Sequence, residues 1–206
     1  MPLRHLLYRC PCCGHDPTSG EGDGAACAGC GASFRRVPPG CHVRVVEPSG
    51  AARVVHPRAL VRRVREAGGP RTAARKADGT VRYEARVMCS EALSFRPVRR
   101  AGRLLGFFES QGRERPGTVV AGREGLSFEA VGGGAGRHWS FLDITGIQVS
   151  SSALQIKPRG AVLVQLRFPD DSPLRWEELV QWLMREAYTE HGRGLVVEFQ
   201  PRVVVA

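Results

Sequence analysis

Two short cysteine motifs, Cys10-Pro11-Cys12-Cys13-Gly14 and Cys27-Ala28-Gly29-Cys30-Gly31, decide how the first part of this chain folds. In each motif two cysteines lie three positions apart, Cys10 and Cys13 in the first and Cys27 and Cys30 in the second, and a glycine follows the later one. The two intervening residues let the chain turn so that both sulfurs face one ion, and the glycine relieves crowding where backbone N–H groups approach the sulfurs. Two such motifs supply four thiolates, which suits a closed tetrahedral metal site.

The motif spacing selects four cysteines as metal ligands, namely Cys10, Cys13, Cys27 and Cys30. Other donors also occur in this region: Cys12, which offers an alternative register in the first motif, and His15, Cys41 and His42. A four-thiolate site holds zinc or iron, and the donor set does not choose between the two metals. Because a closed site has no open position for water, we expect a structural metal. A thioredoxin-like redox pair needs a strand and a helix around the motif, which these glycine-rich flanks do not predict.

Over roughly residues 8 to 36, the two motifs resemble the knuckles of the zinc-ribbon family, which usually read C-P-x-C-G and C-x-x-C-G. The resemblance implies a small domain at residues 1–36 with a structural zinc ion on the four cysteines. The loop between the motifs is polar and glycine-rich, so we expect this domain to depend on the ion for its stability. The stretch Val-Pro-Pro-Gly at 37–40 predicts a linker into a basic connecting segment at 37–100.

The positive charge of the chain is unevenly distributed. The 206 residues carry a net charge of +10, but residues 1–104 hold 19 basic and 8 acidic side chains, whereas residues 105–206 hold 11 and 12. The excess is densest from Arg53 to Arg103, with 14 basic and 4 acidic side chains. This asymmetry predicts an anionic partner: acidic membrane lipid, an acidic protein or nucleic acid. The alternative is a compositional effect, because 28 of the 30 basic residues are arginine, as a GC-rich coding sequence produces without selection for binding.

A short amphipathic helix is predicted over residues 57–67, since Pro57 suits a first helical position and Gly68-Gly69-Pro70 ends the pattern. Its apolar residues fall at helical spacing on one face: Leu60, Val61, Val64 and Ala67. The other face carries the arginines Arg58, Arg62, Arg63 and Arg65. Such a helix lies on an anionic membrane, contacts phosphates, or docks its apolar face on a neighbouring domain with solvated arginines outside. The few aromatic residues in this half weaken the nucleic-acid alternative.

The remainder of the chain predicts short strands separated by glycine turns, with one strong helix. Strands are expected at 81–88, 104–109, 117–121, 126–131, 138–149, 153–157, 161–168 and 195–205. The helix is expected near 173–190, with an apolar stripe of Trp176, Leu179, Val180, Leu183 and Ala187. The isolated Cys89 is expected to be a small buried residue. The pattern predicts an antiparallel, meander-like sheet.

Residues 101–206 resemble the pleckstrin-homology and GRAM superfamily, on hydrophobic-pattern motifs at Gly117–Val120, Gly125–Phe128 and Trp139–Ile147, followed by a strand and the helix. The resemblance implies a mainly β fold with α+β character, in which the zinc ribbon precedes an antiparallel bent barrel capped by the C-terminal helix. It carries no catalytic residues. Lipid-binding members place basic residues at positions that Arg103, Arg113 and Arg115 match here, although Glu109 and Glu114 dilute the positive field.

The chemistry expected of the chain is binding and not catalysis. The Gly132–Gly136 run lies between two expected strands, so it predicts a hairpin loop and not a nucleotide cradle, and no local nucleophile or metalloprotease motif occurs. We find neither a signal-peptide core nor an apolar run of membrane-spanning length, and expect a soluble cytoplasmic protein, peripheral at the membrane if it binds lipid. The sequence thus predicts a non-enzymatic adaptor or scaffold. The alternatives are a nucleic-acid-binding zinc-ribbon protein and an accessory subunit of a larger complex.

Overall fold

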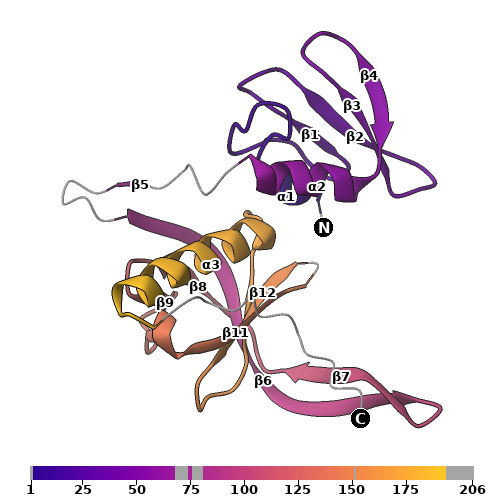
Figure 1. The fold of residues 1–206 in the computed structure, drawn as a ribbon. Helices are drawn as coiled ribbons and strands as arrows, with labels where there is room; N and C mark the ends of the chain where they lie inside the picture. The colour runs from indigo at the N-terminus through magenta and orange to yellow at the C-terminus, as the bar shows by residue number, and fades with distance from the viewer. Residues whose placement is uncertain (1, 68–73, 76–80, 151, 194–206) are drawn as a thin grey trace. The chain divides into compact units, whose positions relative to one another are not determined.

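The computed structural model describes residues 2–67, 74–75, 81–150 and 152–193. The chain divides into two units, which we describe separately: Met1–Ala73 with Leu174–Leu179, and Ala74–Pro173 with Val180–Ala206. Figure 1 shows that each unit is built around β-strands. The strand predicted at 195–205 lies outside the described residues.

The first unit is a four-stranded antiparallel sheet with two helices. In chain order its elements are α1 (Leu3–Leu6), β1 (Gly24–Ala26), β2 (Ser33–Val37), β3 (His42–Val46), β4 (Ala52–Val55) and α2 (Pro57–Glu66). The strands lie side by side in the order β1-β2-β3-β4. The stretch 37–40, expected as a linker, closes the β2–β3 hairpin instead, because Val37 pairs directly with His42. The sheet that begins between the cysteine motifs therefore continues beyond residue 36, through β4.

A hydrophobic core holds the first unit together. It is formed by Leu3, Leu7, Tyr8, Cys10, Ala25, Cys27, Ala32, Phe34, Val43, Val45, Leu60 and Val64. The predicted apolar face of α2 is confirmed in part: Leu60 and Val64 are buried, whereas Val61 and Ala67 are only half-buried. The unit, which we expect to depend on an ion for its stability, also has an apolar core, and six of the twelve core residues lie in α1, β2, β3 and α2, outside the polar loop between the motifs. Two of the four predicted metal ligands, Cys10 and Cys27, belong to this core, and Cys30 packs against it.

The second unit contains a long antiparallel sheet. Its elements are β5 (Ala74–Arg75), β6 (Val81–Arg100), β7 (Arg103–Gln111), β8 (Arg115–Ala121), β9 (Gly125–Ala130), β10 (Arg137–Ser140), the 3-10 turn η1 (Phe141–Asp143), β11 (Ile144–Val149), β12 (Ala153–Pro158), β13 (Val164–Arg167) and α3 (Pro173–Glu190). The main sheet has the order β10-β9-β8-β6-β13-β12-β11. The mainly β fold with antiparallel sheets and a C-terminal helix is confirmed. Among the described residues, no strand pairing closes this order into a ring.

Strand β6 is much longer than the predicted strand at 81–88. Its first part pairs with β8 and, at Met88–Glu91, also with β13. Its second part pairs with β7, from Ala92 opposite Gln111 to Arg100 opposite Arg103. We call this two-stranded extension the β6–β7 ribbon, and Figure 1 shows it running out from the rest of the sheet. The sequence pattern missed the extension because apolar and polar residues do not alternate strictly between 89 and 100.

Three smaller predictions are also confirmed. The helix α3 spans Pro173–Glu190, and all five residues of its predicted apolar stripe are buried. Cys89 is fully buried. The glycine run joins two antiparallel strands, β9 and β10, and its Gly132 and Gly133 have φ of 88° and 80°, a backbone region that strongly favours glycine. The predicted strand at 138–149 is divided into β10 and β11 by the turn η1.

The core of the first unit predicts a contrast between two valines on neighbouring strands. Val45 of β3 is fully buried, whereas Val54 of β4 is 53% exposed. We expect Val45→Ala to lower the free energy of unfolding by about 1.5–3 kcal/mol, since it removes most of a fully buried apolar side chain. Val54→Ala should change it by less than about 0.5 kcal/mol. Urea unfolding of the two variants measures both values, and equal losses would contradict the core described here.

Candidate functional site

The two cysteine motifs fold into matching knuckles. In the first, the Cys10 N–H donates to the carbonyl of His15 at 2.8 Å, and the Gly14 N–H donates to the carbonyl of Cys10 at 2.9 Å. In the second, Cys27 and Gly31 make the equivalent bonds, both of 2.9 Å. Gly14 and Gly31 have φ of 74° and 77°, which explains why glycine follows each motif. The backbone alone therefore turns each pair of sulfurs toward a common point.

Four sulfurs meet at that point. The Sγ atoms of Cys10, Cys13, Cys27 and Cys30 all lie within 4.8 Å of one another. Cys10 and Cys30 are 3.7 Å apart, and Cys13 and Cys27 are 3.5 Å apart. A tetrahedral ion with metal–sulfur bonds of about 2.3 Å holds its sulfurs about 3.8 Å apart, so the spacing fits a four-thiolate ion site. Cys12 lies outside this group; its N–H instead approaches the Cys10 sulfur at 3.4 Å.

The electrostatics of the cluster favour a bound cation. Burial raises the pKa of Cys10 well above that of an ordinary thiol, and desolvation also raises the pKa of Cys13. Burial acts in the same direction on Cys27, but hydrogen bonds from the Cys30 backbone and the Cys13 thiol lower its pKa below the ordinary value. Several thiolates so close together need a compensating positive charge, which a metal ion supplies. Four protein donors would close the site, an arrangement that suits a structural ion.

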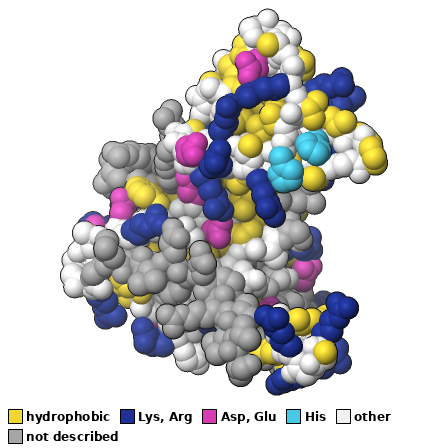
Figure 2. All heavy atoms as spheres, turned by 45° about the vertical axis from the view of Figure 1, so that its right-hand side comes forward, with side chains coloured by type: hydrophobic (Ala, Val, Ile, Leu, Met, Phe, Trp, Pro, Cys, Tyr) yellow, Lys and Arg dark blue, Asp and Glu magenta, His cyan; other side chains and the backbone are white. Residues whose placement is uncertain are grey.

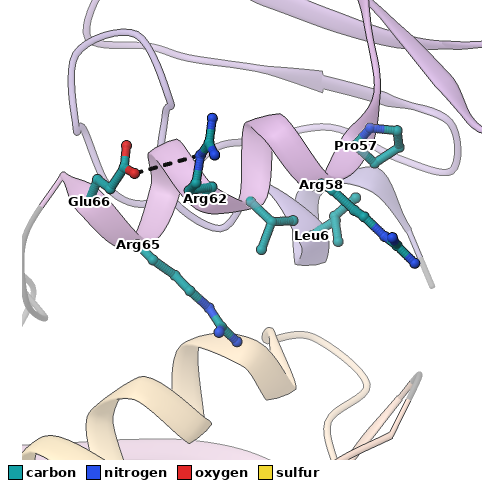
Figure 3. Close-up of a pocket in the computed structure, with 7 residues that line it drawn as sticks. Leu6, Pro57, Arg58, Arg62, Arg65 and Glu66 are labelled. Carbon is teal, nitrogen blue, oxygen red and sulfur yellow. Dashed lines mark ion pairs between the residues drawn. The ribbon is translucent and has the colours of Figure 1, made fainter.

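The predicted basic helix forms one wall of an open groove. The groove has a volume of about 580 Å³ and is lined by Leu6, Pro57, Arg58, Val61, Arg62, Arg65 and Glu66. Figure 3 shows Arg58, Arg62 and Arg65 projecting from α2, with Leu6 approaching the helix from α1. Arg62 pairs with Glu66 at 3.7 Å, and Arg65 pairs with Glu177 of the same unit at 3.0 Å. No described acidic residue pairs with the exposed side chains of Arg58 and Arg63, which are available to an external anion.

The three anion-binding residues predicted in the second unit differ in their surroundings. Arg103 and Arg113 are exposed and form no ion pair with a described residue. Arg115 lies 3.8 Å from Glu91 and stacks over the ring of Phe128, so its charge is partly used within the fold. Glu114 makes two hydrogen bonds with Arg167, and this pairing lowers its pKa. The negative charge of Glu114 therefore neutralises Arg167. It weakens the positive field of Arg103, Arg113 and Arg115 less than the sequence predicts.

The structure adds further candidates on the β6–β7 ribbon. Together with Arg103, the ribbon carries Arg96, Arg99 and Arg100, all exposed, and no acidic residue occurs from Ala92 to Phe108. Among the described residues, eight large hydrophobic side chains are exposed, and five of them are on the ribbon: Leu93, Phe95, Val98, Leu105 and Phe108. Figure 2 shows arginine and hydrophobic side chains together at the lower end of the molecule, where the ribbon lies. The density of basic residues was the only sequence signal for this surface.

Comparisons with protein-family models and with curated proteins find no match to this chain. Among the described residues, no helix is both long enough and apolar enough to cross a membrane. The class of site rests on its own geometry: four converging cysteines that could hold a metal ion, in a β-rich protein.

The cluster geometry predicts different effects for two adjacent cysteines. Cys13→Ser removes one of the four converging sulfurs, so we expect cobalt-substituted protein to lose the absorption of a four-thiolate ion and the midpoint of thermal unfolding to fall by about 10 °C or more. Cys12→Ser should leave both measurements unchanged. The opposite result, with Cys12→Ser disrupting the spectrum, would show that the ion uses the other register.

Proposed function

We propose that this protein is a non-enzymatic adaptor, stabilised by a structural zinc ion, that binds an anionic surface. The acidic surface of a cytoplasmic membrane is the partner that the exposed side chains favour. The observation that carries the proposal is that arginines with no acidic partner among the described residues and exposed apolar side chains occur together on the β6–β7 ribbon.

The ribbon combines the two contributions that hold a protein at a membrane interface. Apolar side chains insert between lipid headgroups, and arginines attract acidic lipids, each contributing about 1 kcal/mol near the surface. Phe95 and Phe108 are 48% and 54% exposed, and Leu93 is 75% exposed. Arg96 lies over the ring of Phe108 at 5.4 Å, which places a charge beside an apolar side chain. A surface that only kept the protein soluble would not need this many exposed hydrophobic residues.

The helix α2 supports the proposal from the other unit. Its apolar face is used in the core, so it does not need a membrane to bury Leu60 and Val64. Its exposed Arg58 and Arg63 instead add positive charge, and Arg58 also lines a groove that contains the apolar residues Leu6, Pro57 and Val61. Such a groove suits an amphipathic anion, whose charged group pairs with arginine while its apolar part contacts Leu6 and Val61.

The architecture of the second unit supports the predicted resemblance to the pleckstrin-homology and GRAM superfamily. The strands β6, β8, β9 and β10 form one antiparallel meander, β11, β12 and β13 form another, and β6 joins them. A helix follows the last described strand. We propose that this unit is such a domain, with the β6–β7 ribbon as a long hairpin between its first two main-sheet strands. Because one fold serves many functions, the binding assignment rests on the ribbon's side chains and not on the resemblance.

Vesicle flotation tests the proposal. At about 0.15 M salt, where screening removes charge effects beyond roughly 8 Å, the protein should float with acidic vesicles and not with neutral ones. Changing Arg99, Arg100 and Arg103 to Gln should weaken binding by about a hundredfold, given about 1 kcal/mol for each arginine. Changing Arg58 and Arg63 to Gln should weaken it by about tenfold or more.

A matched control removes the same charge from ion-paired positions. Arg86, Arg123 and Arg159 pair with Asp170, Glu190 and Asp143, so changing these three to Gln alters the net charge as the ribbon variant does but leaves the ribbon intact. The control should float almost as the unmodified protein does. No flotation in any form would reject the lipid assignment. A steep loss of oligonucleotide affinity with salt would then favour nucleic acid, and absence of both would favour an accessory subunit.

A further inference from the structure

Three metal-ligating side chains lie outside the four-cysteine cluster, at one end of the first unit's sheet. Cys41 ends the β2–β3 connection, His42 begins β3, and His56 directly follows β4. The pairing of Val43 with Val55 brings these positions together, because His42 and His56 extend that register by one residue. All three side chains are exposed. Figure 2 shows two histidine side chains, in cyan, next to each other on the surface.

The distances suit one ion. The Cys41 sulfur lies 3.5 Å from Nε2 of His56. With metal–sulfur and metal–nitrogen bonds of about 2.3 and 2.0 Å, a tetrahedral ion holds sulfur and nitrogen about 3.5 Å apart, so these two donors already have the required spacing. The ring of His42 contacts that of His56 edge to face, with centroids 5.8 Å apart. Because His42 is exposed, rotation of its side chain brings a ring nitrogen to the same ion.

We propose that Cys41, His42 and His56 form a second metal site, for zinc or a similar thiophilic ion. It differs in kind from the four-cysteine cluster. One thiolate and two imidazoles leave the fourth coordination position open to water or to a ligand from a partner, and the site lies at the surface. The ion at this site is therefore exchangeable, whereas the ion among the four cysteines is closed in.

Binding at this site is coupled to the start of α2. His56 is the N-cap of that helix, and its Nδ1 accepts the Arg58 N–H at 3.2 Å, which leaves Nε2 facing Cys41. When a metal takes Nε2, the ring proton resides on Nδ1, and the hydrogen bond from Arg58 is lost. Zinc should therefore increase amide hydrogen exchange in the first turn of α2, a signature that binding elsewhere would not produce.

Metal content tests the proposal on the full chain, prepared without a histidine tag. After equilibration with micromolar zinc and removal of the excess, elemental analysis should give two zinc ions per chain, one of them removable by a weak chelator. Cys41→Ser should reduce the content to one, and so should His56→Asn, which keeps an effective helix N-cap but lacks the imidazole. His138→Gln, a histidine in the second unit, should leave it at two.

The outcomes are distinguishable. One zinc ion in both the unmodified protein and the variants would overturn the proposal, as would two zinc ions in all of them. Cobalt substitution adds a spectroscopic measurement, since the second ion should show sulfur-to-cobalt charge transfer that Cys41→Ser abolishes. None of these results depends on membrane binding, so the experiments test the metal site independently of the adaptor function.

Discussion

Backbone hydrogen bonding along β6 is the constraint on which the second unit depends. The first part of this strand lies between β8 and β13 and forms hydrogen bonds with β8 along one edge and with β13 along the other. This pairing joins the two meanders into one sheet. Beyond Glu91 the strand continues with only β7 beside it in the described sheet. A two-stranded ribbon has no second layer to bury its side chains, so the apolar residues of its sequence remain exposed. The most distinctive surface of the unit follows directly from the length of one strand.

In the first unit, the four-cysteine cluster, which could hold a metal ion, and the apolar core share residues. Cys10 and Cys27 belong to the same buried cluster as Phe34, Val43 and Val64, so an ion that fixes the sulfurs also fixes the positions of apolar neighbours. The knuckles need little from the rest of the sheet, because their own N–H groups and glycines set their shape. The helix α2 supplies what the polar loop between the knuckles lacks, which is apolar area to bury. This division explains how a region with so many glycines and polar residues forms a unit.

The arginines of the chain perform different tasks, although their sequence density suggests one. Those that pair with carboxylates, such as Arg62 and Arg167, stabilise local structure, and their charge is partly neutralised. Those without described acidic partners, such as Arg63 and Arg103, are exposed, and their positive charge faces solvent. A count of charges predicts an anionic partner but cannot separate these groups, because some arginines pair with an acid that only the fold brings near, as Arg167 does with Glu114. The proposed binding surfaces rest on this separation.

Features that depend on neighbouring residues could be predicted from the amino-acid sequence. Cysteine spacing and glycine position predicted the four-sulfur cluster, since a knuckle is closed by its own backbone, and periodicity predicted α2 and α3 because a helix repeats its pattern within a few turns. Three features became visible in the fold alone: residues 37–40 close a hairpin, β6 continues to Arg100, and Cys41 and His42 meet His56. Each of these depends on which strands pair and in what register, and local patterns do not specify either, even where the partner follows directly in the sequence, as His42 does for Val37. For the same reason, the sequence predicts an excess of positive charge but does not predict which arginines face solvent.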